Sequence, residues 1–290
     1  MSASSFHPHP RRPQLRLPAG SCDTHVHVFG PVARFPFAEQ AGFRPCDAPK
    51  EQLFALHDHL GIQRCVVVQS TCHGYDNAVT EDALTARGGR YRGIALVPLE
   101  VTDAELLRLD AAGFRGARFN FMRHLGAAAP IEAVIAFGAR LAPIGWHLQV
   151  HFESALIHEL APFFRQSPVP VVIDHMGRVD AALGVDHSHF AMLRATLKDT
   201  RVWVKVSGCD RISRSGPPYG DAVPFARMLV EEFPERVLWG TDWPHPNHAG
   251  PVPDDGLLVD LLAAIAPNER DRQMLLVDNP ARLYRFGAES

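Results

Sequence analysis

The sequence has neither an excess of basic residues nor a long apolar stretch. Its 29 lysine and arginine residues are balanced by 32 aspartate and glutamate residues, which gives a formal net charge of −3. A protein that grips a phosphate backbone needs a basic surface, so nucleic acid is not expected as a partner. No run reaches the roughly 18 consecutive apolar residues of a transmembrane helix, so no membrane span is expected.

Cysteine is scarce, and several common motifs are missing. The five cysteines form an odd, scattered set without a CxxC pair, so we expect no disulfide framework and a cytoplasmic location. Neither of the phosphate-binding patterns GxGxxG and GxxxxGKS/T is present, which argues against a nucleotide-binding, doubly wound sheet. No GxSxG motif is present, which argues against a serine hydrolase with a nucleophile elbow.

What the chain does have is enough length for one large domain, and many histidines. A (β/α)₈ barrel typically needs about 250 residues, and the chain has 290, of which 16 are histidine. Residues 1–18 are rich in serine, proline and arginine and lack the apolar core of a secretory signal. We expect a flexible N-terminal tail over 1–18, with an ordered strap near Leu15–Pro18 as the alternative, and a single domain over 19–290.

Short apolar runs alternate with longer helical patterns from residue 22 onward. The runs are rich in valine and isoleucine, as expected of parallel strands buried on both faces. Eight strands are predicted, over Cys22–Phe29, Cys65–Gln69, Tyr91–Val97, Gly116–Phe121, His147–Phe152, Val169–Asp174, Val202–Ser207 and Val237–Gly240. Helices are predicted over Ala48–Leu60, Asn77–Arg87, Asp103–Ala112, Ile131–Ala142, Ser154–Gln166, His189–Lys198, Asp221–Phe233, Asp254–Ile265, Asn268–Leu276 and Pro280–Phe286. This eightfold alternation predicts a (β/α)₈ TIM-type barrel.

The catalytic residues of such a barrel are expected at the C-terminal ends of its strands. Strand 1 ends with His25 and His27, whose rings share a face because residues two apart in a strand point the same way. The HxH spacing alone is a weak signal, since it recurs at His7/His9, His57/His59 and His187/His189. We set aside the pairs in the tail and on the first helix. Strands 5, 6 and 8 end near His151, His175 and Asp242, and their convergence on one mouth predicts an active site.

Charged side chains at the same strand ends indicate the chemistry. Three arginines follow the ends of three different strands and are expected at the same end of the barrel, namely Arg118, Arg178 and Arg211. A guanidinium group binds carboxylates in a bidentate manner. An anionic substrate is therefore predicted. Asp242 can act as a general base for water, while the imidazoles can bind a divalent metal or donate hydrogen bonds to a substrate oxygen. A carboxylate-bearing ester or lactone that is attacked by water fits both features.

Six segments resemble the motifs of one enzyme family. They occur in family order, at Cys22–Pro31, Val68–Gly74, Arg118–Phe121, Val172–Arg178, Gly240–Asn247 and Asn279–Tyr284. On these segments the chain resembles the amidohydrolase superfamily, and within it the 2-pyrone-4,6-dicarboxylate lactonase group. The resemblance implies a somewhat distorted (β/α)₈ barrel and the reversible hydrolysis of a lactone.

The resemblance also implies roles for single residues. Asp242 would take the proton from water. Three histidines would surround the polarised carbonyl in an oxyanion-hole role, namely His25, His27 and His175. The implied substrate contacts are Arg118, Arg178, Arg211, Thr71, His124, Phe43 and His151.

Three of these positions depart from the lactonase pattern. Phe43 and His151 stand where that group has substrate-binding tyrosines. His124 stands at an arginine position, with Arg123 beside it. Because these contacts differ, a monocarboxylate or a sugar-acid lactone is an alternative substrate.

A metal ion is the alternative to catalysis without a cofactor. Many amidohydrolases hold one divalent ion with a strand-1 HxH pair, a strand-5 histidine and a strand-8 aspartate. The corresponding residues here are His25, His27, His151 and Asp242. Three imidazoles and one carboxylate suit Zn²⁺, which would acidify a bound water. The lactonase group itself resembles a metal-independent branch, so we expect that no cofactor is required, with one Zn²⁺ as the alternative.

Other functions stay open on the same barrel. A metal-dependent sugar-acid lactonase or decarboxylase would use the same ligand set, the latter with His175 as the acid and base. A catalytically silent binding barrel would have no use for Asp242. Cys72, beside His73, is an alternative nucleophile, although a buried inert thiol is the simpler interpretation. We favour a lactone hydrolase with a small anionic substrate, as a monomer or a homo-oligomer.

Overall fold

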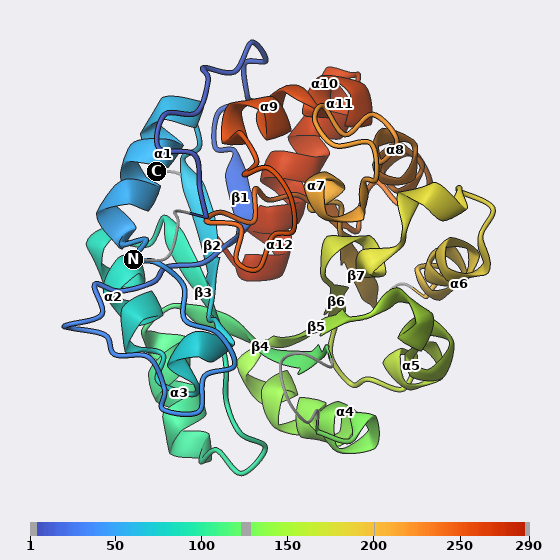
Figure 1. The fold of residues 1–290 in the computed structure, drawn as a ribbon. Helices are drawn as coiled ribbons and strands as arrows, with labels where there is room; N and C mark the ends of the chain where they lie inside the picture. The colour runs from blue at the N-terminus through green and yellow to red at the C-terminus, as the bar shows by residue number, and fades with distance from the viewer. Residues whose placement is uncertain (1–4, 123–128, 200, 288–290) are drawn as a thin grey trace.

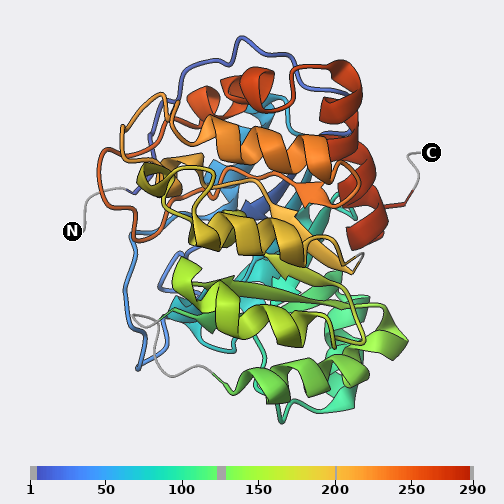
Figure 2. The same cartoon turned by 90° about the vertical axis from the view of Figure 1, so that its right-hand side faces the viewer.

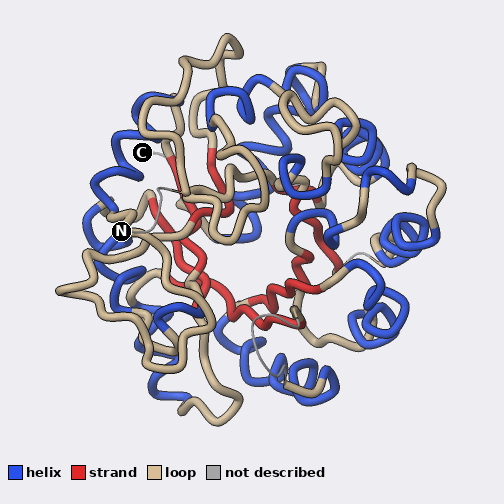
Figure 3. Tube along the Cα trace, viewed as in Figure 1, coloured by secondary structure: helices blue, strands red, loops and turns tan. Residues whose placement is uncertain are grey.

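In a computed structural model, eight parallel strands form a ring that is surrounded by helices (Figures 1 and 3). The structure describes residues 5–122, 129–199 and 201–287. The strands follow one another around the sheet in chain order: β1 (Cys22–Val26), β2 (Arg64–Val68), β3 (Tyr91–Ala95), β4 (Phe114–Phe121), β5 (His147–Phe152), β6 (Val171–Ile173), β7 (Val202–Lys205) and β8 (Val237–Leu238). All eight predicted strands are present, so the prediction of a (β/α)₈ barrel is confirmed.

The helices run alongside the strands on the outside of the barrel (Figure 2). They are α1 (Lys50–Leu60), α2 (Ala78–Ala86), α3 (Asp103–Ala111), α4 (Ile131–Leu141), α5 (Ile157–Phe164), α6 (Ser188–Thr196), α7 (Cys209–Ile212), α8 (Val223–Glu232), α9 (Asp255–Asp260), α10 (Leu262–Ile265), α11 (Glu269–Gln273) and α12 (Asn279–Tyr284). The helix predicted over 254–265 is divided into α9 and α10, and α7 was not predicted. Within the described ranges, no helix is long and apolar enough to cross a membrane.

The barrel closes where the chain after β8 meets β1. The backbone N–H and the hydroxyl of Thr24 both donate to the carbonyl of Trp239, at 2.9 and 2.8 Å. One step further along, the N–H of Asp242 donates to the carbonyl of His25 at 2.8 Å. Gly240 makes this contact possible, because a Cβ there would lie 2.5 Å from the backbone nitrogen of His25. The two predicted catalytic segments are therefore joined through their main chains.

Most of the buried side chains of the strands are apolar, but some of those inside the barrel are polar. Strand β2 carries three consecutive buried valines, as expected where helices cover the outer face and side chains fill the inner one. In β5 and β7, Gln149 and Lys205 are also completely buried. Buried polar groups need hydrogen-bond partners. Gln149 and Lys205 find theirs in each other and in residues near the C-terminal ends of neighbouring strands.

The N-terminal segment passes over the barrel beside α9 and α10 (Figure 2). Its backbone N–H groups at Arg11 and Leu15 donate to the carboxylates of Asp254 and Asp260, at 3.1 and 2.9 Å. The ring of Phe6 lies 5.1 Å from that of Trp243. These contacts describe one conformation, so the flexibility predicted for residues 1–18 and the domain boundary after residue 18 stay predictions.

Candidate active site

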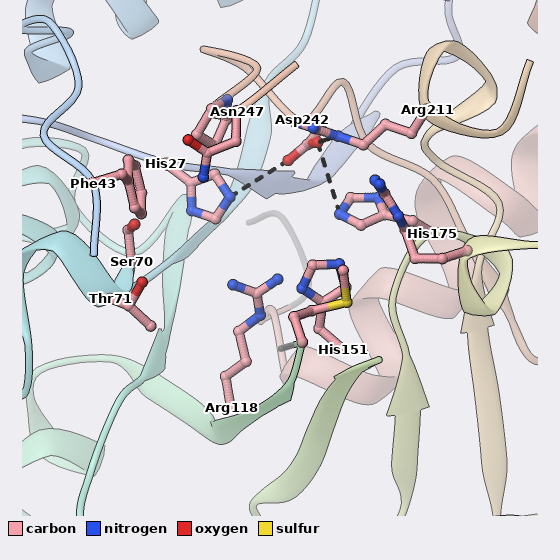
Figure 4. Close-up of a pocket in the computed structure, with 13 residues that line it drawn as sticks. His27, Phe43, Ser70, Thr71, Arg118, His151, His175, Arg211, Asp242 and Asn247 are labelled. Atoms are coloured by element: carbon pink, nitrogen blue, oxygen red, sulfur yellow. Dashed lines mark hydrogen bonds and ion pairs between the residues drawn. The ribbon is translucent and has the colours of Figure 1, made fainter. Parts of the chain in front are cut away.

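A pocket opens at the C-terminal ends of the strands (Figure 4). Its empty volume, including the part open to solvent, is about 510 Å³. It is lined by His27, Phe43, Ser70, Thr71, Arg118, Met122, His151, His175, Arg178, Arg211, Asp242, Pro246 and Asn247. Nine of these residues were predicted from the sequence.

Asp242 occupies one wall of the pocket and is almost completely buried. Its Oδ1 lies 3.4 Å from Nε2 of His27 and 3.6 Å from Nε2 of His25. Its Oδ2 lies 3.7 Å from Nε2 of His175 and accepts a hydrogen bond from Nε of Arg211. The structure thus brings the four predicted catalytic side chains together. Burial opposes ionisation of Asp242, but Arg211 and the imidazoles outweigh it and hold the pKa of this carboxyl well below its ordinary value.

His175 and Arg178 reach the pocket through a left-handed turn that follows β6. The backbone φ angles of His175, Met176, Gly177 and Arg178 are 49°, 53°, 61° and 55°. Each non-glycine residue in this conformation costs roughly 1–2 kcal/mol, and such strain persists where the surroundings impose it, often at functional sites. Nδ1 of His175 lies 3.1 Å from the hydroxyl of Ser207. Burial lowers the pKa of His175 well below its ordinary value, so the ring is neutral.

The three predicted arginines line the pocket but differ in their partners. Nε of Arg118 donates to Oδ2 of Asp174 at 3.0 Å, and Arg211 pairs with Asp242. Within the described ranges, Arg178 has no hydrogen-bond or ion-pair partner. Burial, followed by the nearby Arg211, lowers the pKa of Arg178 to about 10, so its guanidinium is charged at neutral pH. An anion in the pocket would supply the partner that Arg178 lacks.

The remaining predicted contacts have different outcomes. Thr71, Phe43 and His151 all line the pocket, and Figure 4 shows His151 beside Arg118, across from Asp242. Both ring nitrogens of His151 are buried, and no partner for them is found among the described residues. His124 lies outside the described residues. His25 is completely buried behind the pocket wall, so it does not belong to the lining.

The donors of a metal site are only partly assembled. Two groups of potential ligand atoms lie within 4.8 Å of one another: His25, His27 and Asp242 form one, and His25, Asp174 and His175 form the other. His151, predicted as a ligand, belongs to neither group among the described residues. Asp242 is already paired with Arg211, and an ammonium, that of Lys205, lies 3.2 Å from Nδ1 of His25. Three of the four predicted donors therefore lie together in a group that could hold an ion, and cations contact two of them, His25 and Asp242.

A buried polar network beneath the pocket was not predicted. Oδ2 of Asp174 accepts hydrogen bonds from Arg118 and, at 3.2 Å, from the amide of Gln149. Lys205 donates to Oε1 of Gln149 at 2.9 Å. Burial lowers the pKa of Lys205 to about 8. A lysine at the end of an otherwise apolar strand, β7, is the signal that could have revealed the network.

Four lining residues were also missed as site residues, namely Ser70, Met122, Pro246 and Asn247. Each of them lies close in the sequence to a predicted residue or within one of the motif segments. None of the four is charged or is a histidine, the residue types from which the site was predicted, so their chemistry gave little signal. Proximity to the strand ends was the available clue.

Comparisons with known proteins show the family of the chain. The family model described as Amidohydrolase matches residues 22–286. The chain is 50% identical to a 2-pyrone-4,6-dicarboxylate hydrolase of Comamonas testosteroni, over 96% of this chain and 94% of that protein. It is 42% identical to a 4-sulfomuconolactone hydrolase of Rhizobium radiobacter, over 92% and 91% of the two chains. A crystal structure of a probable 2-pyrone-4,6-dicarboxylic acid hydrolase from Acinetobacter baumannii, with citric acid bound, is 26% identical and superposes with a TM-score of 0.81, covering 92% of this chain and 100% of that one. The chain belongs to the amidohydrolase family.

Proposed function

We propose that the protein hydrolyses a lactone that carries at least one carboxylate, 2-pyrone-4,6-dicarboxylate or a close relative of it. The observation that carries this proposal is the meeting of three arginines and one carboxylate around a single pocket. The arginines bind the anion, and the carboxylate activates water. The names of the two relatives support the proposal, since both are hydrolases and both substrates contain acidic groups.

In the proposed reaction, Asp242 removes a proton from a water molecule, whose oxygen attacks the lactone carbonyl carbon. The carbonyl oxygen becomes an oxyanion, which N–H groups of the surrounding imidazoles stabilise. The tetrahedral intermediate then collapses, and the bond between the carbonyl carbon and the ring oxygen breaks. Asp242 returns its proton to the leaving ring oxygen, so the carboxylate is regenerated and the product is an open-chain acid.

Binding of the substrate is assigned to Arg118 and Arg178, with Arg211 shared between the substrate and Asp242. A carboxylate that draws Arg211 away from Asp242 would raise the pKa of Asp242 and make it a better base. Thr71, Phe43, His151 and His124 are assigned to the remaining contacts. Because a guanidinium also binds a sulfonate, a sulfonated muconolactone is the second candidate substrate, which the name of one relative supports.

We propose that hydrolysis requires no metal ion. The partial donor set, with cations already in contact with His25 and Asp242, supports this. A metal-dependent decarboxylase and a metal-dependent sugar-acid lactonase are less well supported for the same reason. A cysteine nucleophile has little support, because Cys72 is completely buried and burial raises the pKa of its thiol to about 12. A reducing cytoplasm stays our expectation for the location of its five free thiols.

The test is ring opening of a panel of lactones by purified protein, with and without a chelator and with metal content measured in parallel. The panel contains 2-pyrone-4,6-dicarboxylate, a monocarboxylated pyrone, 4-sulfomuconolactone and several aldonolactones. We expect the carboxylated pyrones to be opened by protein that contains no stoichiometric metal. Activity on aldonolactones alone, or only in the presence of metal, would contradict the proposal.

A further inference from the structure

Lys205 is a buried ammonium with a complete set of partners. Its Nζ lies 2.9 Å from the carbonyl oxygen of Thr24, 2.9 Å from Oε1 of Gln149 and 3.2 Å from Nδ1 of His25. An ammonium has three N–H donors and no acceptor. Two of its three partners are oxygens that can only accept. The third N–H therefore points to Nδ1 of His25, which must offer a lone pair to receive it.

A competing arrangement exists, because Oδ1 of Asp174 also lies near this contact. It is 3.3 Å from Nδ1 of His25 and 3.5 Å from Nζ of Lys205. If Nδ1 of His25 carried the proton and donated a hydrogen bond to Asp174, Nε2 would be unprotonated. Its lone pair would then face Oδ1 of Asp242, 3.6 Å away. Two acceptors would then face each other in a buried site. The arrangement in which Lys205 donates avoids this, because Nε2 then carries the proton and faces a carboxylate.

We propose that Lys205 is a positioning residue that fixes His25 as the tautomer with its proton on Nε2. His25 then directs its Nε2–H toward Oδ1 of Asp242, 3.6 Å away, on the wall of the pocket. Nε2 of His25 is buried and makes no closer hydrogen bond within the described ranges. This inference rests on the proposed function only in naming Asp242 as the base that this N–H orients.

The same tautomer weakens the site as a metal site. An imidazole binds a metal through an unprotonated ring nitrogen. In the proposed state, one nitrogen of His25 accepts from Lys205 and the other carries a proton. Each of the two donor groups that could hold an ion includes His25. Lys205 therefore selects hydrogen-bond donation over metal coordination at the centre of the barrel mouth.

The proposal is tested with Lys205→Met, and with Lys198→Met, at an exposed lysine in the turn after α6, as the matched control. The first readout is the tautomer of His25, measured by ¹⁵N NMR of histidine-labelled protein and assigned with His25→Asn. The second is the affinity for Zn²⁺ alone, measured by calorimetry. We expect an Nε2–H signal in the wild type. Lys205→Met should lose the preference for that tautomer and gain at least tenfold in zinc affinity, while Lys198→Met should match the wild type.

Activity provides a third readout. Loss of a general base typically lowers the rate by about 10²–10⁴-fold. Because Lys205→Met keeps Asp242 and loses only the N–H that orients it, we expect a decrease in kcat of about 10–100-fold with KM within a factor of about three. A larger effect on KM than on kcat would contradict a positioning role toward the transition state.

Lys205→Met removes one of the cations near the buried carboxylate of Asp174 and can destabilise the protein. The double variant Lys205→Met/Asp174→Asn removes both charges, and the same measurements are made on it if the single variant does not fold. An Nδ1–H signal at His25 in the wild type, or unchanged tautomer and zinc affinity in both variants, would overturn the proposal. The NMR and zinc measurements need no substrate, so they decide this proposal even if no lactone is hydrolysed.

Discussion

Nε2 of His27 lies 3.4 Å from Oδ1 of Asp242, while Nδ1 of the same ring lies 2.7 Å from the carbonyl oxygen of Val68. A carbonyl oxygen only accepts, so Nδ1 of His27 carries a proton. Imidazoles therefore hold Asp242 on one side and Arg211 holds it on the other, so its orientation is set before a substrate binds.

Asp242→Asn should abolish most of the activity without unfolding the protein. An amide cannot accept the proton of the attacking water, and loss of a general base lowers the rate by about 10²–10⁴-fold. The measurement is kcat on the best lactone of the panel, together with thermal unfolding. Asp58→Asn is the matched control, because the Asp58 side chain is 71% exposed. Near-normal turnover in Asp242→Asn would remove this residue from the role of base.

Arg178→Met should raise KM for carboxylated lactones and change kcat much less. A charge-assisted hydrogen bond contributes about 1.5–3 kcal/mol, which corresponds to about 10–150-fold in binding. Arg118→Met should raise KM similarly but also lower the melting temperature, because it removes a partner of buried Asp174. Arg34→Met, at a side chain that is 63% exposed, is the control. An unchanged KM in both variants would mean that neither guanidinium meets the substrate.

The strands and strand-end residues could be predicted because their signals are local. Parallel strands buried on both faces give continuous apolar runs, and the fold itself places their ends at one mouth. Asp242 and His175 were predicted in this way. The partners of their side chains could not be, because rotamers and contacts between distant strands have no local signal. The bonds from Lys205 to His25 and Gln149 join three strands and became visible only in the structure.

His57 is a different kind of error, because the sequence contained the signal. We set the His57/His59 pair aside as a surface helix pair, yet His57 is 1% exposed and its Nδ1 lies 2.6 Å from the hydroxyl of Tyr91. Its Nε2 lies 3.6 Å from Oδ2 of Asp23, which accepts a hydrogen bond from Thr241 beside Asp242. The buried residues of α1 are Leu53, Leu56, His57 and Leu60, the spacing of one helix face. That spacing assigns His57 to the core.

Gly240→Ala should disrupt the junction between β8 and β1. Its Cβ would lie 2.5 Å from the backbone nitrogen of His25 and 2.7 Å from Oδ1 of Asp23, and the backbone cannot yield easily. Overpacking of this kind typically lowers the free energy of unfolding by about 1–3 kcal/mol. Chemical denaturation measures the effect, and Gly220→Ala, where a Cβ meets nothing within 4 Å, is the control. Equal stability of the two variants would show that the junction adapts.

The buried pair His245 and Asp255 should contribute less to stability as the pH rises above neutrality. Nε2 of His245 lies 3.1 Å from Oδ1 of Asp255. Burial alone would lower the pKa of His245, but Asp255 and Asp210 raise it overall above its ordinary value of 6.5. A raised pKa in the folded state stabilises the protein fully below the unfolded value, and this stabilisation is lost as the pH rises through the folded value.

The melting temperature measured from about pH 6 to about pH 9 tests this linkage. Asp255→Asn removes the carboxylate that raises the pKa of His245, so its melting temperature should fall less steeply over this range. Lys205 also titrates in this range in both proteins, and the comparison of slopes separates His245 from it. Identical slopes would assign the pH dependence to other groups.

The proposed function requires that the arginine-lined pocket selects a carboxylated lactone for attack by water activated at Asp242. The most direct test is the ratio of kcat/KM for 2-pyrone-4,6-dicarboxylate to that for its neutral dimethyl ester, measured at the lactone bond in protein treated with a chelator. Loss of two charge-assisted contacts predicts a ratio of at least about 100 in favour of the dicarboxylate. A ratio near one, or turnover of the dicarboxylate only after metal is added back, would contradict the account.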